Sequence, residues 1–253
     1  MSRISRLQQK FEQLYIDAFL VTDQKNIYYL TGFNLLQGDG CLLVTPQNAI
    51  IITDERYQLA LEEFESDEVV ATISRDYYGS VNKICEGLNL TVLGYEDTIS
   101  YHLFDAFDEL MTSDIVPFHH LIEKMRLVKD STEINKLRAA AELQSAGYDY
   151  FLSIVHPGIT ERELAIKLDY WMKMQGASGP SFPTIVASGA NSAKPHATAS
   201  SKPIADGDVV TLDFGYYLDG YTADMTRTFA VGSIDPELLS LIHISEPTRL
   251  ALI

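Results

Sequence analysis

The dipeptide Asp219-Gly220 constrains the carboxyl-terminal half of this chain more than any other feature of the sequence. A two-residue type I′ turn prefers this pair, because both central residues need positive φ. A turn at this point predicts a β-hairpin with a fixed register. The diagnostic cross-strand pairs of that register are Leu218 with Tyr221, Gly215 with Asp224, and Asp213 with Thr226.

The predicted register decides which side chains share a face, because side chains alternate along a strand. One face is almost wholly apolar apart from Arg227, and we expect it to pack against a core; it carries Val210, Leu212, Phe214, Met225 and Phe229. The other face is polar and carries Thr211, Asp213, Asp224, Thr226 and Thr228. Asp213 and Asp224 become diagonal neighbours with Cβ atoms roughly 7 Å apart, and Gly215 leaves space beside them.

Two carboxylates this close repel each other unless a cation or a proton lies between them. Divalent cations bind carboxylate oxygens, and hydrolases use pairs of such ions roughly 3.5 to 4 Å apart. The spacing alone leaves two interpretations open. Asp213 and Asp224 either ligate metal or belong to a solvated acidic hairpin, since acidic residues are common on exposed strand faces.

Short helical and strand patterns alternate through the first 120 residues, which is typical of a sheet flanked by helices. The predicted strands are 18–22, 40–45, 49–53, 69–73, 91–94 and 115–118. The predicted helices are 4–14, 26–30, 55–64, 80–88 and 101–111. A relatively basic segment follows, and we place the domain boundary there, with an α/β domain at 1–123 and a linker at 124–130.

The second half begins with helical signals. Asp130-Ser131 with Glu133 in the first turn predicts a long helix from about 131 to 155. Thr160 and Glu163 have capping-box spacing, which predicts a second helix as far as Gly176. A strand at 182–187 and a turn at 189–192 follow, and Pro195-His196 comes after them.

Composition excludes several classes of protein. The 253 residues include 19 Lys and Arg against 35 Asp and Glu, so the formal net charge is −16 and nucleic acid is not expected as a partner. Cys41 and Cys85 cannot form a disulfide framework, and we expect two reduced, buried thiols. No signal peptide and no apolar run of roughly 18 residues is present, so we predict a cytoplasmic protein without membrane association.

Several motifs resemble the pita-bread metallopeptidases, in particular Xaa-Pro aminopeptidases and Xaa-Pro dipeptidases (prolidases). The hairpin matches at Leu212-Asp213-Phe214-Gly215 and at residues 221–228. Residues 181–189 and 191–196 resemble the family's substrate-side segment. Residues 26–33 and 53–57 are similar to the creatinase-type amino-terminal domain of these enzymes.

The resemblance implies a creatinase-like α/β domain followed by a partial α+β pita-bread domain at 131–238. It implies that Asp213 and Asp224 are ligands of two divalent ions, manganese, cobalt or zinc. It also implies that His196 is a catalytic residue that contacts the bound peptide and steadies the tetrahedral intermediate. The implied activity is hydrolysis of the bond preceding proline, the implied partners are proline-containing peptides, and family members are often homodimers.

The pattern breaks near the carboxyl terminus. The family's later strands supply a histidine and two glutamates that complete the metal site, whereas residues 239–253 do not resemble that segment. We interpret 239–253 as a non-native tail and expect an inactive fragment of a proline peptidase. The alternatives are a non-catalytic peptide-binding or scaffold protein that retains the fold, and a fragment that does not fold stably because sheet edges are exposed.

Overall fold

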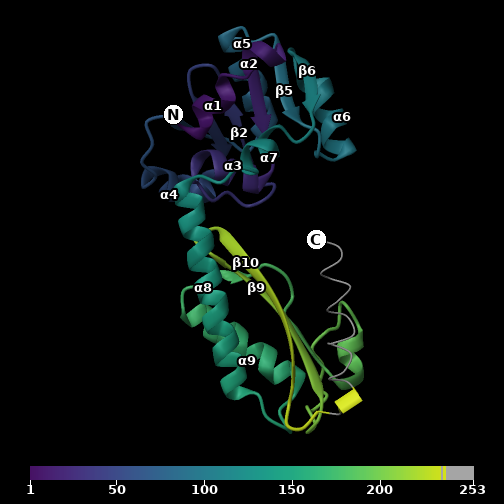
Figure 1. Ribbon diagram of the computed structural model, residues 1–253. Coiled ribbons are helices and arrows are strands. Elements are labelled where there is room, and N and C mark those ends of the chain that lie inside the picture. The colour runs from purple at the N-terminus through teal and green to yellow at the C-terminus, as the bar shows by residue number, and fades with distance from the viewer. Residues whose placement is uncertain (235, 238–253) are drawn as a thin grey trace. The chain divides into compact units, whose positions relative to one another are not determined.

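The computed structural model describes residues 1–234, 236 and 237 (Figure 1). The chain divides into two compact units, and the boundary lies between Val128 and Lys129. This division falls inside the segment 124–130, and helix α7 (Leu121–Arg126) extends through the first three residues of that segment. The tail predicted at 239–253 lies outside the described residues.

The first unit is built on a six-stranded mixed sheet with the order β4-β3-β2-β1-β5-β6. Its strands are β1 (Ala18–Val21), β2 (Gly40–Val44), β3 (Ala49–Thr53), β4 (Val69–Ile73), β5 (Val92–Glu96) and β6 (Asp114–Phe118). The β1-β2 and β2-β3 pairs are antiparallel, and the β3-β4, β1-β5 and β5-β6 pairs are parallel. The predicted hairpin of β2 and β3 is confirmed.

Helices cover both faces of this sheet. They are α1 (Arg3–Gln8), α2 (Phe11–Leu14), α3 (Gln24–Thr31), η1 (Glu55–Tyr57), α4 (Gln58–Glu62), α5 (Tyr77–Leu88), α6 (Tyr101–Leu110) and α7. Phe19 and Val21 belong to a core shared with α1, α2, α3 and α7. Leu20, between them in sequence, belongs to a second core shared with α5 and α6. Both faces of the strand are buried, which explains its uninterrupted apolar sequence.

The predicted opening helix at 4–14 is two short helices in the structure. Tyr15 ends α2 in the left-handed region at φ 56°. Ile4, Leu7 and Phe11 are nevertheless buried in the same core. Two short helices on one face therefore satisfy the apolar spacing as well as one long helix does, and the spacing alone does not distinguish them. The predicted helix at 55–64 is divided in the same way, into η1 and α4.

The second unit has two helices packed on an antiparallel sheet. Its elements are α8 (Ser131–Ile154), α9 (Glu161–Met174), β7 (Gly179–Pro180), β8 (Ile185–Ser188), η2 (Gly189–Ala193), β9 (Val209–Leu218) and β10 (Tyr221–Ala230). Both capping boxes are present, with Asp130 and Glu133 at α8 and Thr160 and Glu163 at α9. The strand predicted at 182–187 is observed as β8, which begins two residues after Pro183, a residue without an N–H to donate.

The core of the second unit lies between the two helices and the β9–β10 hairpin, along which α8 runs (Figure 1). Leu212 and Phe214 of β9 are fully buried there with Leu164, Leu168 and Met172 of α9. The apolar face predicted from the hairpin register is thus the face that packs on the core. Within residues 1–234, no helix is both long and apolar enough to cross a membrane.

Candidate functional site

The β9–β10 hairpin has the register predicted from Asp219-Gly220. Leu218 lies opposite Tyr221, Gly215 lies opposite Asp224, and Asp213 lies opposite Thr226. Asp219 and Gly220 have φ values of 49° and 77°, the left-handed region that a type I′ turn requires at both central positions. The pairing prediction is confirmed.

The two aspartates lie on the polar face of this hairpin. Asp213 is half-buried and Asp224 is exposed, while Leu212 and Phe214, which flank Asp213, are fully buried on the opposite face. The hydroxyl of Thr226 donates a hydrogen bond to Oδ1 of Asp213 at 2.7 Å. In the described part of the chain, this is the one hydrogen bond that the Asp213 carboxylate accepts, and the Asp224 carboxylate accepts none.

Gly215 makes room for a chain segment beside the aspartates. A Cβ atom at this position would lie 2.5 Å from Ser181 Oγ, 2.8 Å from Phe182 Cε1 and 2.9 Å from the Ala223 carbonyl oxygen. The Ser181 amide donates to the Gly215 carbonyl at 2.9 Å. Glycine is therefore required for a close approach, which brings the start of the segment 181–189 against the strand that carries Asp213.

His196 lies in the loop that follows η2, and its side chain is exposed. The loop follows β8, which pairs with β9. Ile185 at the start of β8 lies opposite Asp213, and Ser188 at its end, where the loop begins, lies opposite Val210, three residues away from Asp213 along β9. No hydrogen bond or ion pair joins His196 to Asp213 or Asp224 among the described residues. The structure thus brings the two aspartates together on one face and places His196 on a neighbouring loop.

The described residues provide only part of a set of metal ligands. Within residues 1–234, 236 and 237, no group of three His, Cys, Asp or Glu side chains is close enough to share one ion. Asp213 and Asp224 fit a divalent cation in ligand type, and they share one face of the hairpin. The space beside Gly215, expected from the sequence to be open, is filled by Ser181 and Phe182. The two aspartates supply two ligands of a site that needs more.

Glu161 is a buried carboxylate beside the loop that carries His196, and the sequence patterns did not single it out. It is 0% exposed and accepts hydrogen bonds from Ser188, Asn191 and Ser200. Burial alone raises the pKa of Glu161, but the hydrogen bonds from Ser200 and Ser188 outweigh it and the pKa is lowered. One sequence signal could have identified Glu161. The first turn of α9 contains two glutamates, Glu161 and Glu163, and the capping box uses only Glu163.

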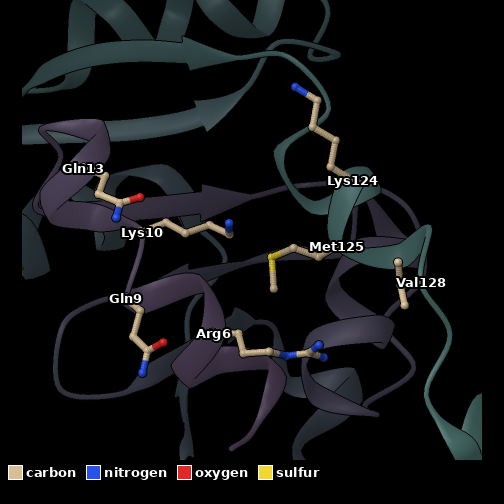
Figure 2. A pocket seen from close by; sticks show the side chains of 7 residues that line it. All are labelled: Arg6, Gln9, Lys10, Gln13, Lys124, Met125 and Val128. Atoms are coloured by element: carbon tan, nitrogen blue, oxygen red, sulfur yellow. The ribbon is translucent and has the colours of Figure 1, made fainter.

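A pocket of about 450 Å³ lies in the first unit (Figure 2). It is lined by Arg6, Gln9, Lys10, Gln13, Lys124, Met125 and Val128. These side chains include no His, Cys, Asp or Glu that could ligate a metal ion. The pocket therefore does not have the ligands of a metal-dependent hydrolytic site.

Comparison with known proteins agrees with the fold and with the hairpin. Residues 3–128 match the creatinase/prolidase N-terminal domain, and residues 135–253 match metallopeptidase family M24. The uncharacterized peptidase YqhT of Bacillus subtilis is 35% identical over 248 residues, which cover 96% of this chain and 69% of that protein. The Xaa-Pro dipeptidase of Pyrococcus furiosus is 33% identical over 235 residues, which cover 91% of this chain and 65% of that protein.

Among solved structures, the Xaa-Pro dipeptidase from Bacillus anthracis superposes with a TM-score of 0.87 at 37% identity, covering 98% of this chain and 69% of that one. The chain belongs to metallopeptidase family M24, with a creatinase/prolidase-type amino-terminal domain. Its fold is accordingly the two-domain creatinase arrangement with a partial pita-bread domain. The chain spans about two thirds of the length of these relatives, between 65% and 69%.

Proposed function

We propose that this chain is part of a prolidase-type peptidase, an enzyme whose activity is metal-dependent hydrolysis of the peptide bond that precedes proline. The observation that carries the proposal is the β9–β10 hairpin, where Asp213 and Asp224 share one polar face beside Gly215. The relatives named Xaa-Pro dipeptidase, from Pyrococcus furiosus and Bacillus anthracis, support the substrate class. The substrates are dipeptides or short peptides with proline in the second position.

Asp213 and Asp224 are the proposed metal ligands, for two manganese, cobalt or zinc ions. Such a pair of ions, when bound, supplies Lewis-acid activation of water and of the scissile carbonyl. The protein's own contribution is to hold the carboxylates in place. Thr226 fixes Oδ1 of Asp213 at 2.7 Å, and the apolar opposite face of β9 anchors the strand in the core.

His196 is the proposed catalytic and substrate-binding residue. Its exposed imidazole lies on the loop that follows β8, the strand paired with the Asp213 strand, and it can donate to a carbonyl oxygen of a bound peptide. A hydrogen bond of this kind stabilises negative charge as it develops on that oxygen. We place the protein in the cytoplasm, and a homodimer is compatible with the proposal.

A second candidate function follows from the ligand count. Because the described residues provide two aspartates and no third ligand beside them, the chain as given is proposed to be inactive. A protein that keeps the fold and binds proline-containing peptides without cleaving them fits the same observation. Peptide binding without turnover separates this candidate from the enzyme.

A direct test titrates the 253-residue chain with Mn²⁺ and follows free Mn²⁺ by electron paramagnetic resonance. We expect Asp213→Ala and Asp224→Ala each to weaken binding, whereas Asp149→Ala, an exposed aspartate on α8, leaves it unchanged. Equal affinity in all four proteins would contradict the ligand assignment. Incubation with an Xaa-Pro dipeptide and Mn²⁺ is expected to give no hydrolysis, and metal-dependent turnover would contradict the proposed inactivity of this chain.

A further inference from the structure

Both ends of the loop that carries His196 donate hydrogen bonds to the same buried side chain. The loop follows β8 at Ser188, continues through η2, and returns to the body of the second unit at Ser200. Glu161, at the first position of helix α9, contacts both of these serines. A single carboxylate therefore closes the loop.

The two oxygens of Glu161 divide the two ends of the loop between them. Oε1 accepts hydrogen bonds from the Ser188 amide at 2.7 Å and the Ser188 hydroxyl at 2.8 Å. Oε2 accepts from the Ser200 amide at 3.0 Å, the Ser200 hydroxyl at 2.6 Å and Asn191 Nδ2 at 3.0 Å. Each oxygen thus binds one end of the loop. Oε2 also binds the short helix η2 through Asn191.

We propose that Glu161 is a positioning residue for His196, acting as a clasp that fixes the geometry of the loop 189–199. The functional part of this inference rests on the proposed role of His196 in peptide binding. The clasp itself rests only on the five hydrogen bonds and on the complete burial of the Glu161 side chain.

Only an ionised carboxylate meets the demands of this position. Five donors converge on two oxygens, and an ionised carboxylate accepts at both oxygens with no hydrogen of its own to conflict with the donors. A glutamine would place an NH₂ group against donors at one end of the loop and leave them unsatisfied in a buried place. The first turn of a helix also favours a negative charge, because the amino-terminal end of the helix dipole is positive.

Other contacts hold the two ends of the loop to the unit without the help of Glu161. Ser188 pairs with Val210 through the β8–β9 ladder, and its hydroxyl accepts from Lys202 Nζ at 2.8 Å. The Ser200 carbonyl accepts from the Arg162 amide at 2.9 Å. Loss of the clasp should therefore loosen the loop between these anchors while the sheet and the helices stay folded.

Hydrogen exchange of the 253-residue chain, followed by mass spectrometry, tests the clasp without metal or peptide. We expect Glu161→Gln to speed exchange of peptides within 188–200 by roughly tenfold or more, since the local opening becomes easier. Peptides from α8 and β10 should keep their wild-type rates. Unchanged exchange within 188–200 would overturn the proposal.

The matched control is Glu163→Gln, in the same first turn of α9. The Glu163 carboxylate accepts hydrogen bonds from the N-cap residue Thr160, through its amide at 2.9 Å and its hydroxyl at 2.7 Å, and among the described residues it accepts none from the loop. This variant should speed exchange at the start of α9 and not within 188–200. If Glu161→Gln does not fold, Ser200→Ala removes the 2.6 Å bond to Glu161, together with the bond that the Ser200 hydroxyl accepts from the Lys202 amide at 3.1 Å, and is expected to speed exchange around residues 197–200.

A binding measurement separates positioning from simple stabilisation. Affinity for an Xaa-Pro dipeptide, measured by isothermal titration calorimetry, should fall in Glu161→Gln by about the factor measured for His196→Ala. It should not fall in Glu163→Gln, even at an equal loss of melting temperature. Loss of affinity in neither Glu161→Gln nor His196→Ala, with a loosened loop, would refute the proposed role of His196 and leave the clasp itself supported.

Discussion

Thr226 donates its hydroxyl hydrogen to Oδ1 of Asp213 at 2.7 Å, and the two residues are directly opposed in the β9–β10 hairpin. The hairpin register alone produces this contact, because opposed residues on one face have Cβ atoms only about 5 Å apart. The bond restricts the rotation of the carboxylate and leaves Oδ2 for another partner. Ligating carboxylates are commonly held by such outer hydrogen bonds.

Replacement of Thr226 by valine should therefore weaken metal binding while preserving the strand. Valine keeps the shape and the β propensity of threonine and removes only the hydroxyl. We expect Mn²⁺ affinity to fall on the order of tenfold, the lower limit for loss of an outer-shell partner. Electron paramagnetic resonance titration of free Mn²⁺ measures the change.

Thr228→Val provides the control on the same strand and the same face. The Thr228 hydroxyl shares its hydrogen bond with Thr211 Oγ1 at 3.1 Å and does not contact a carboxylate. Its replacement should leave Mn²⁺ affinity unchanged. Equal losses in the two variants would mean that the Thr226–Asp213 bond has no specific part in metal binding.

Gly215→Ala should destabilise the second unit. The added Cβ would meet the Ala223 carbonyl oxygen at 2.9 Å, a backbone atom of the paired strand that cannot rotate away, as well as Ser181 and Phe182. Overpacking of this kind costs about 1 to 3 kcal/mol. Urea unfolding followed by the fluorescence of Trp171, the single tryptophan of the chain, reports on this unit.

Gly179→Ala is the companion variant, because a Cβ at Gly179 has no heavy atom within 4 Å. It should change the free energy of unfolding by much less than Gly215→Ala does. A Gly215→Ala variant as stable as Gly179→Ala would show that segment 181–182 moves away from β9 at little cost. In that case the close approach beside Asp213 would not be a fixed property of the site.

The hairpin and the capping box of α9 could be predicted from sequence because their causes are local. Asp219-Gly220 sets the register, and the alternation of side chains then assigns Asp213 and Asp224 to one face. Thr160 and Glu163 are three residues apart, so their mutual hydrogen bonds follow from helix geometry. In each case the contacting residues are close in sequence or are related to each other through one turn.

Glu161 could not be predicted in the same way, because its partners come from three separate places in the chain. Ser188, Asn191 and Ser200 are 27 to 39 residues away from it. Nothing in their spacing distinguishes a buried acceptor from a second solvated glutamate in the first turn of a helix. Such a site depends on how α9 packs against the end of β8, which only the folded structure defines.

The first unit should lose stability in acid through Asp54. Hydrogen bonds from the Arg56 side chain and from the Tyr77 hydroxyl hold the pKa of Asp54 well below its usual value of 3.8. As the pH falls below 3.8, the unfolded chain binds a proton at this residue before the folded chain does. The stabilisation by Asp54 is therefore complete above pH 3.8 and is lost as the pH approaches the lower folded pKa.

Asp54→Asn should make the first unit less stable at pH 7 and should reduce the slope of its stability between pH 4 and pH 2. Hydrogen exchange of β3, which ends beside Asp54, measures the stability of this unit separately from the second. Asp105→Asn, at an exposed position on α6, should change neither the stability at pH 7 nor the slope. Parallel pH profiles for the wild type and Asp54→Asn would show that the contacts with Arg56 and Tyr77 contribute nothing to the acid sensitivity of the fold.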